Sequence, residues 1–137
     1  MLLRAGACSC IVLLAACGSR PADAPANVFT GPGALPAPRL EPNAAPPEIL
    51  GMRFSSLDVN RGDEWSGEFV TGTNVASIEV RTNLFSINVP HVSAGHFRFT
   101  LDVLDTPPIF VREYRLRVIA RNSPGNAYEE DVPFRIR

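Results

Sequence analysis

Apolar and polar side chains alternate with a period of two along much of this sequence. The run 112–122 shows it most clearly: Tyr114, Leu116, Val118 and Ala120 fall on one face, and Glu113, Arg115, Arg117 and Arg121 on the other. Because a strand places successive side chains on opposite faces, this run predicts a strand with one face in a core and one in solvent. No stretch shows the period of an amphipathic helix, and turn residues interrupt the alternation at short intervals, which is typical of a sandwich or barrel.

The same alternation predicts seven strands between Glu48 and Arg137, and therefore a single all-β domain over 48–137. Seven strands in about 90 residues favour a sandwich of two sheets. On the other six strands, the residues expected to point inward are Met52 and Phe54; Trp65 and Phe69; Ala76, Ile78 and Val80; Phe85, Ile87 and Val89; Phe97, Phe99, Leu101 and Val103; and Val132, Phe134 and Ile136.

Three segments carry a family resemblance. The run Tyr114-x-Leu116-x-Val118-x-Ala120-x-Asn122 with Gly125-Asn126 resembles strand F and the following turn of bacterial immunoglobulin-like domains, and fibronectin type III domains have a similar run. Gly62 to Gly67 and Asn74 to Val80 resemble strands B and C of the same group. The resemblance implies an immunoglobulin-like sandwich, in which the hydroxyl of Tyr114 would bond a nearby backbone group. It implies no particular activity, because this fold hosts many.

The N-terminus has the order of a secretory signal: Met1 and Arg4, then a short apolar run that ends at Leu14-Ala15-Ala16-Cys17. This tetrapeptide resembles the lipobox of bacterial lipoproteins, which implies a signal peptide over 1–16 and a lipid attached to Cys17. Lipidation would anchor the protein in the cell envelope, and Gly18 in place of an aspartate favours the outer over the inner membrane by the same resemblance. An ordinary cleaved signal and a chance apolar start are the alternatives.

Residues 17–47 follow as a lipidated cysteine and a stretch rich in proline and alanine. Since this stretch has few large apolar side chains to bury, we expect a disordered tether, about 90 Å long at full extension. Cys8 and Cys10 belong to the leader and Cys17 to the anchor, so we expect no disulfide in the exported domain.

The composition, with few histidines and cysteines, gives no support for a catalytic site. The chain has 13 basic and 14 acidic residues, so it has no electrostatic basis for binding nucleic acid. Its two histidines, His91 and His96, have no cysteine beside them, and Ser93 lies in no nucleophile elbow. The acidic run 129–131 lacks the spacing of a calcium loop. We therefore expect no enzyme activity, no metal and no cofactor.

Two surface features are candidates for binding. Arg115, Arg117 and Arg121 form a basic stripe that either pairs with acids such as Glu79 or faces an anionic glycan. The stiff segment 106–111 contains Ile109 and Phe110, which are either exposed anchors for a partner or a plug under the sandwich.

These observations predict a lipid-anchored envelope protein that binds another envelope protein or a glycan, or gives structural support. An envelope enzyme or its accessory subunit, acting on glycan or protein, is one alternative, and a passive spacer is another.

Overall fold

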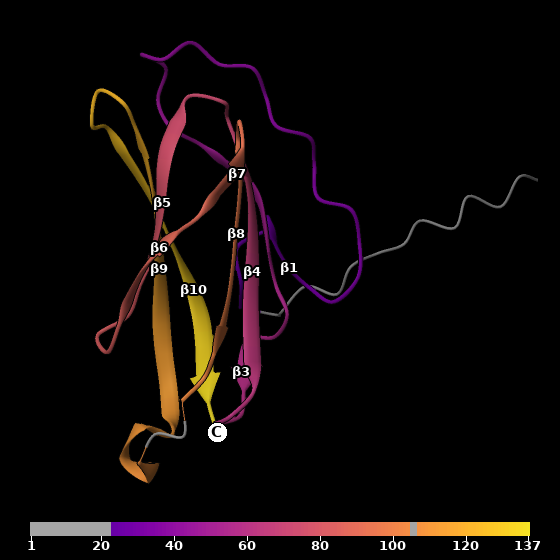
Figure 1. The fold of residues 1–137 in the computed structure, drawn as a ribbon, viewed down its shortest axis with the longest axis vertical. Coiled ribbons are helices and arrows are strands. Elements are labelled where there is room, and N and C mark those ends of the chain that lie inside the picture. Colours follow the sequence, from indigo (N-terminus) through magenta and orange to yellow (C-terminus); the bar gives the residue numbers. More distant parts are fainter. Residues whose placement is uncertain (1–22, 105–106) are drawn as a thin grey trace, which may run out of the picture.

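Two β-sheets face each other in the computed structural model, which describes residues 23–104 and 107–137 (Figure 1). Their strands are β1 (Val28–Thr30), β2 (Ile49–Phe54), β3 (Asp58–Val59), β4 (Glu64–Thr71), β5 (Val75–Arg81), β6 (Ser86–Val89), β7 (His91–Ser93), β8 (His96–Asp102), β9 (Arg112–Asn122) and β10 (Ala127–Ile136), and a short 3-10 helix, η1 (Pro108–Phe110), precedes β9.

The first sheet has the order β1-β2-β4-β8-β7 and the second the order β3-β10-β9-β5-β6. Both are mixed, because β1 runs parallel to β2 and β3 parallel to β10, whereas the other neighbours are antiparallel. The long β9–β10 pair keeps its register from Arg112 opposite Ile136 to Arg121 opposite Ala127. The all-β sandwich expected from the alternation is therefore confirmed.

The expected number of strands is wrong, since ten strands rather than seven lie within the described residues. All seven expected strands are present, as β2, β4, β5, β6, β8, β9 and β10. The additional β1, β3 and β7 have two or three residues each. Strands this short contain too few positions for a period of two to stand out, and two of them form parallel pairs at a sheet edge.

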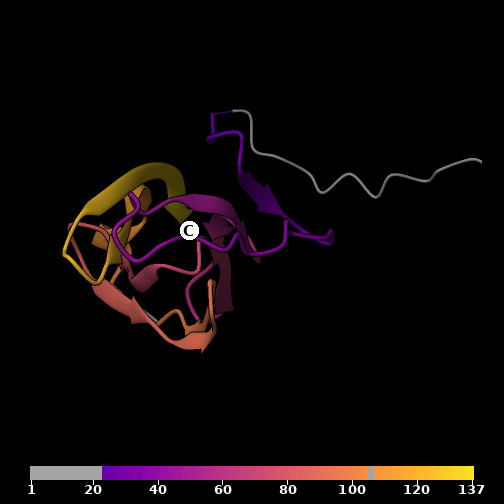
Figure 2. The same cartoon turned by 90° about the horizontal axis from the view of Figure 1, so that it is seen from above.

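The proline-rich stretch is not a free tether over its described part, which contradicts the expected disorder. We call residues 23–47 the N-terminal strap. It contributes β1 to the first sheet and then passes along the outside of the sandwich before β2 begins (Figures 1 and 2). Val28 is fully buried and Ala24 nearly so. Two small apolar side chains that reach the core thus hold a segment whose composition alone predicts disorder.

Polar contacts fasten the strap at several points. The side-chain amides of Asn74 and Asn122 both donate to the carbonyl of Ala45, at 2.7 and 3.0 Å. The amide of Asn27 donates to the carbonyl of Ile49 at 3.1 Å and to the carboxylate of Glu130 at 3.0 Å. Because these bonds join the strap to both sheets, it belongs to the folded domain, whose described part begins at residue 23 rather than 48.

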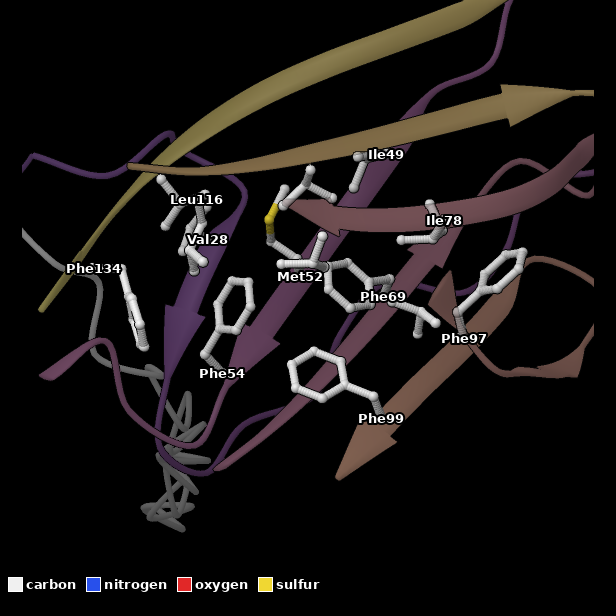
Figure 3. Close-up of a cluster of buried hydrophobic side chains, with 14 of the residues drawn as sticks. Val28, Ile49, Met52, Phe54, Phe69, Ile78, Phe97, Phe99, Leu116 and Phe134 are labelled. Carbon is white, nitrogen blue, oxygen red and sulfur yellow. The ribbon is translucent and has the colours of Figure 1, made fainter. Parts of the chain in front are cut away.

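Aromatic and aliphatic side chains from both sheets fill the space between them (Figure 3). The single tryptophan, Trp65, lies at the centre of an aromatic cluster, with ring centroids 4.9 Å from Phe99 and 4.7 Å from Phe134. Its indole nitrogen donates to the carbonyl of Ser56 at 2.9 Å. Val28 lies among the labelled core side chains, so the strap completes this core.

One inward-facing residue was placed on the wrong face. Ala76 is exposed, and its neighbour Val75 is buried instead. The pairing of β5 with β9 shifts between Val75 and Ser77, which is the sign of a β-bulge. A bulge moves the following side chains to the other face, so strict alternation from Ile78 backwards misplaces Ala76.

Candidate binding groove

An apolar groove with a volume of about 380 Å³ opens at one end of the sandwich. Figure 1 shows that this end carries η1 and the C-terminus. Its floor consists of Trp65, Phe134 and Ile136 from the core. One wall comes from the β5–β6 hairpin, with Leu84, Phe85 and Ile87; the other comes from the end of β8, with Leu101, Val103 and Leu104, and Phe110 of η1. Asp102 is the one charged residue that lines it among the described residues.

The groove exists because the edges of the two sheets separate here. After β6 the chain crosses at Pro90 to the other sheet, where β7 pairs with β8 only at His91–Phe97 and Ser93–His96. Within the described residues, the last part of β8, residues 99–102, therefore has no strand paired to it on the side of β7. The core is accessible there, between β6 and β8. A second recess, of about 360 Å³, continues along this edge and shares Ile87 and Leu101.

The two candidate residues of the stiff segment have different environments. Ile109 is 77% exposed, whereas Phe110 is half-buried and lines the groove. Ile109 is therefore exposed, as the expectation of anchors says, whereas Phe110 packs under the sandwich, as its alternative of a plug says. Backbone bonds from Phe110 to Pro107 and from Val111 to Pro108, both 3.0 Å, form the 3-10 turn that separates their directions.

A tyrosine after the turn holds it in place. The hydroxyl of Tyr114 donates a 2.7 Å hydrogen bond to the backbone carbonyl of Phe110. The expected bond from this hydroxyl to a nearby backbone group is confirmed. Arg112 lies over the ring of Tyr114, with its guanidinium carbon 5.1 Å from the ring centre. The groove wall at Phe110 is thus fixed to β9.

Two exposed residues at the groove were not predicted from the sequence. Leu104 is 75% exposed and Leu84 is 39% exposed. A signal for Leu104 was present: Leu101 and Val103 alternate inward, so Leu104 is an apolar residue at a position where the pattern expects a polar one. Leu84 lies in the turn between β5 and β6, where side chains do not alternate between two faces. The alternation of apolar and polar residues therefore gives no signal for Leu84.

The basic stripe is paired rather than free, as its structural interpretation predicts. Arg121 contacts Glu79 at 3.0 Å, and Arg117 and Arg115 contact Asp131 at 3.1 and 3.6 Å. Hydrogen bonds from Ser86, Arg81 and Arg121 hold the pKa of Glu79 at about 2, well below its ordinary value. Each arginine of the stripe therefore has a carboxylate beside it within the domain.

The other polar candidates are also occupied by partners within the domain. Of the acidic run, Asp131 and Glu129 contact Arg117, and Glu130 accepts a bond from Asn27. His96 lies 2.8 Å from Glu68, and His91 stacks on Phe97 at 4.7 Å. Nowhere in 23–104 and 107–137 do three His, Cys, Asp or Glu residues gather in a way that could hold a metal ion.

A larger and more polar recess, of about 620 Å³, lies across Phe134 from the groove. Asp23, where the described chain begins, lines it together with Glu113 and Tyr114. Three of its charged groups are engaged in ion pairs: Asp58 with Arg137 at 2.6 Å, and Arg135 with Glu113. The apolar groove is the better candidate for binding. Its exposed apolar side chains, Leu84 and Leu104, remain in contact with water, whereas the ion pairs of the recess are made within the domain.

Cys17 and the signal peptide lie outside the described residues. No protein-family model matches the sequence, and no curated protein matches it.

Proposed function

We propose that this protein is a lipid-anchored protein of the cell envelope whose immunoglobulin-like sandwich is a non-catalytic module for binding or structural support. The lipobox ending at Cys17 supports the anchor, and the absence of an aspartate after it supports the outer membrane. Two or more acyl chains on one residue give stable attachment, whereas one gives only marginal attachment. In the part of the chain that is described, no helix has the length and apolar character to cross a bilayer.

The observation that carries the binding role is the apolar groove beside η1. Its walls offer hydrocarbon and aromatic surface with a single carboxylate, from Asp102. Such a site selects its ligand by burying apolar surface, which favours a protein segment or a lipid over a glycan. Catalysis needs convergent polar groups of suitable pKa, and the groove lining provides no such set. Its geometry therefore supports binding better than an enzymatic role.

A passive spacer is less well supported than it was from the sequence. Residues 23–47 are packed on the sandwich, so only the six residue-to-residue steps from Cys17 to Asp23 can separate the domain from its anchor. Six steps of a fully extended chain span about 21 Å, against about 90 Å for the whole stretch. The domain is therefore held close to the bilayer.

A photo-crosslinking amino acid at position 109 of the lipidated protein, in intact cells, tests the binding role. We expect crosslinked product from this position. The matched control is position 40, since Leu40 is 88% exposed and belongs to the strap at the opposite end, where Arg39 bridges to Gly72. Equal or no capture at the two positions would contradict a binding module at the groove.

The anchor is tested separately by detergent partitioning of the Cys17→Ser variant. We expect wild-type protein in the detergent phase and the variant in the aqueous phase or as unprocessed precursor. Unchanged partitioning would contradict lipid attachment at Cys17.

A further inference from the structure

Four exposed apolar side chains gather at the η1 end. In the described residues seven large hydrophobic side chains are exposed, and four of them, Leu84, Leu104, Ile109 and Val111, lie on the groove rim or directly beside it. Ile109 and Leu104 are exposed by 77% and 75%. Such a concentration next to an open apolar groove marks a surface that is covered in the working protein.

The start of the described chain lies on the same half of the sandwich. Asp23 shares a recess with Glu113 and Tyr114, the second and third residues of β9, and Phe134 separates this recess from the groove. The Tyr114 hydroxyl in turn bonds the carbonyl of Phe110 in η1. The chain therefore leaves the sandwich toward its anchor near the end where the apolar cluster lies.

The length of chain before Asp23 limits where the bilayer can be. Six residue steps separate Cys17 from Asp23, a reach of about 21 Å at most. β9 has 11 residues and is about 36 Å long, so it exceeds this reach. A lipidated Cys17 thus brings the bilayer within range of η1, whereas the β9–β10 turn at the far end of β9 lies beyond this reach.

We propose that the η1 end of the sandwich docks on the lipid bilayer, with Ile109 and Leu104 inserted among the acyl chains and the groove open to lipid. This inference rests on the proposed lipid anchor at Cys17 and names the occupant of the same groove. Arg112, exposed and stacked on Tyr114, places a cation beside the cluster and so offers a partner to a lipid phosphate. Exposed apolar groups next to a cation are the composition of interfacial membrane contacts.

The test uses full-length lipidated protein reconstituted in vesicles of phosphatidylethanolamine and phosphatidylglycerol. An environment-sensitive fluorophore is attached at Ile109→Cys or, as the matched control, at Leu40→Cys. Cys17 is blocked by its lipid and Cys8 and Cys10 belong to the leader, so each variant has one reactive thiol. The vesicles contain lipids with a doxyl quencher near the glycerol end of one acyl chain.

We expect the label at position 109 to shift to the blue and to lose fluorescence to the doxyl lipids, and the label at position 40 to do neither. Protein that floats with the vesicles but whose label at 109 is unquenched would overturn the docking while leaving the anchor intact. Protein that does not float would overturn both proposals. A blue shift at 109 that disappears on dilution and ignores the doxyl lipids would show a second copy over the groove, and would also overturn the inference.

Discussion

The hydroxyl of Tyr114 donates a 2.7 Å hydrogen bond to the backbone carbonyl of Phe110, four residues earlier. This bond joins the first buried residue of β9 to the last residue of η1. It fixes the short helix against the sandwich, with Phe110 in the groove wall and Ile109 in solvent. The geometry of the apolar end thus depends on one side chain of the longest strand.

Replacing Tyr114 with Phe removes this bond and keeps the ring. We expect the free energy of unfolding to fall by about 1 kcal/mol, the usual net value of one such bond, and the amides of Phe110 and Val111 to exchange faster with solvent. Urea unfolding followed by Trp65 fluorescence and hydrogen exchange measure the two effects. Tyr128→Phe, at a ring that is 38% exposed, is the control. Equal effects of the two substitutions would contradict the anchoring role of Tyr114.

The strap passes so close to β2 that it leaves no room for a side chain at Gly51. A Cβ atom there would lie 2.9 Å from Cδ of Pro36. We expect Gly51→Ala to destabilise the protein by roughly 1–3 kcal/mol and to speed hydrogen exchange across residues 31–47. Adding Pro36→Ala removes the obstructing ring carbons, and we expect it to recover part of the loss. Full additivity of the two substitutions would mean that the strap does not lie on Gly51.

Glu79 gives the stability a defined dependence on pH. Hydrogen bonds from Ser86, Arg81 and Arg121 lower its pKa from an ordinary 4.5 to about 2 in the folded protein. A lowered pKa contributes stability that is complete above the unfolded value and is lost as the pH falls toward the folded one. We therefore expect urea midpoints to decline between about pH 5 and pH 2, and to decline less in Glu79→Gln. Glu64→Gln, at the exposed start of β4, is the control and retains the wild-type profile.

The sequence predicts those parts of the fold in which apolar residues repeat over long strands. Tyr114, Leu116, Val118 and Ala120 are all buried on one face of β9, and Val132, Phe134 and Ile136 on β10. Ala76 is the exception, because a bulge is a property of strand pairing that alternation within one strand does not contain. The pairing of Arg121 with Glu79 was one of two predicted alternatives, and the spatial arrangement of β5 and β9 decides between them.

The strap and the groove were harder to predict for a different physical reason. Val28 has no periodic apolar neighbours, and its burial depends on a parallel pairing with Met52, far along the chain. Proline content is a measure of local stiffness and says nothing about amides such as Asn74 and Asn122 that bond the strap from elsewhere. The groove likewise results from the divergence of β6 and β8, which only the three-dimensional arrangement of the sheets reveals.

Phe99 is a core position at which we expect the loss of one side chain to cost much more stability than at an exposed position. Its side chain is buried, and its ring lies edge-on to Trp65 at 4.9 Å. We expect Phe99→Ala to lower the free energy of unfolding by about 3–5 kcal/mol, from lost burial and the cavity left behind. Leu40→Ala, at an exposed position, should stay within about 0.5 kcal/mol of wild type. A loss below 1 kcal/mol for Phe99→Ala would contradict the observed packing.

The lipid on Cys17 is the claim on which both the envelope location and the bilayer docking depend. Mass spectrometry of the protein purified from membranes tests it directly. We predict a chain that begins at Cys17 and carries the added mass of a diacylglycerol, with no such species from Cys17→Ser. A mature chain with an unmodified thiol at Cys17, or one that retains Met1 to Ala16, would contradict it.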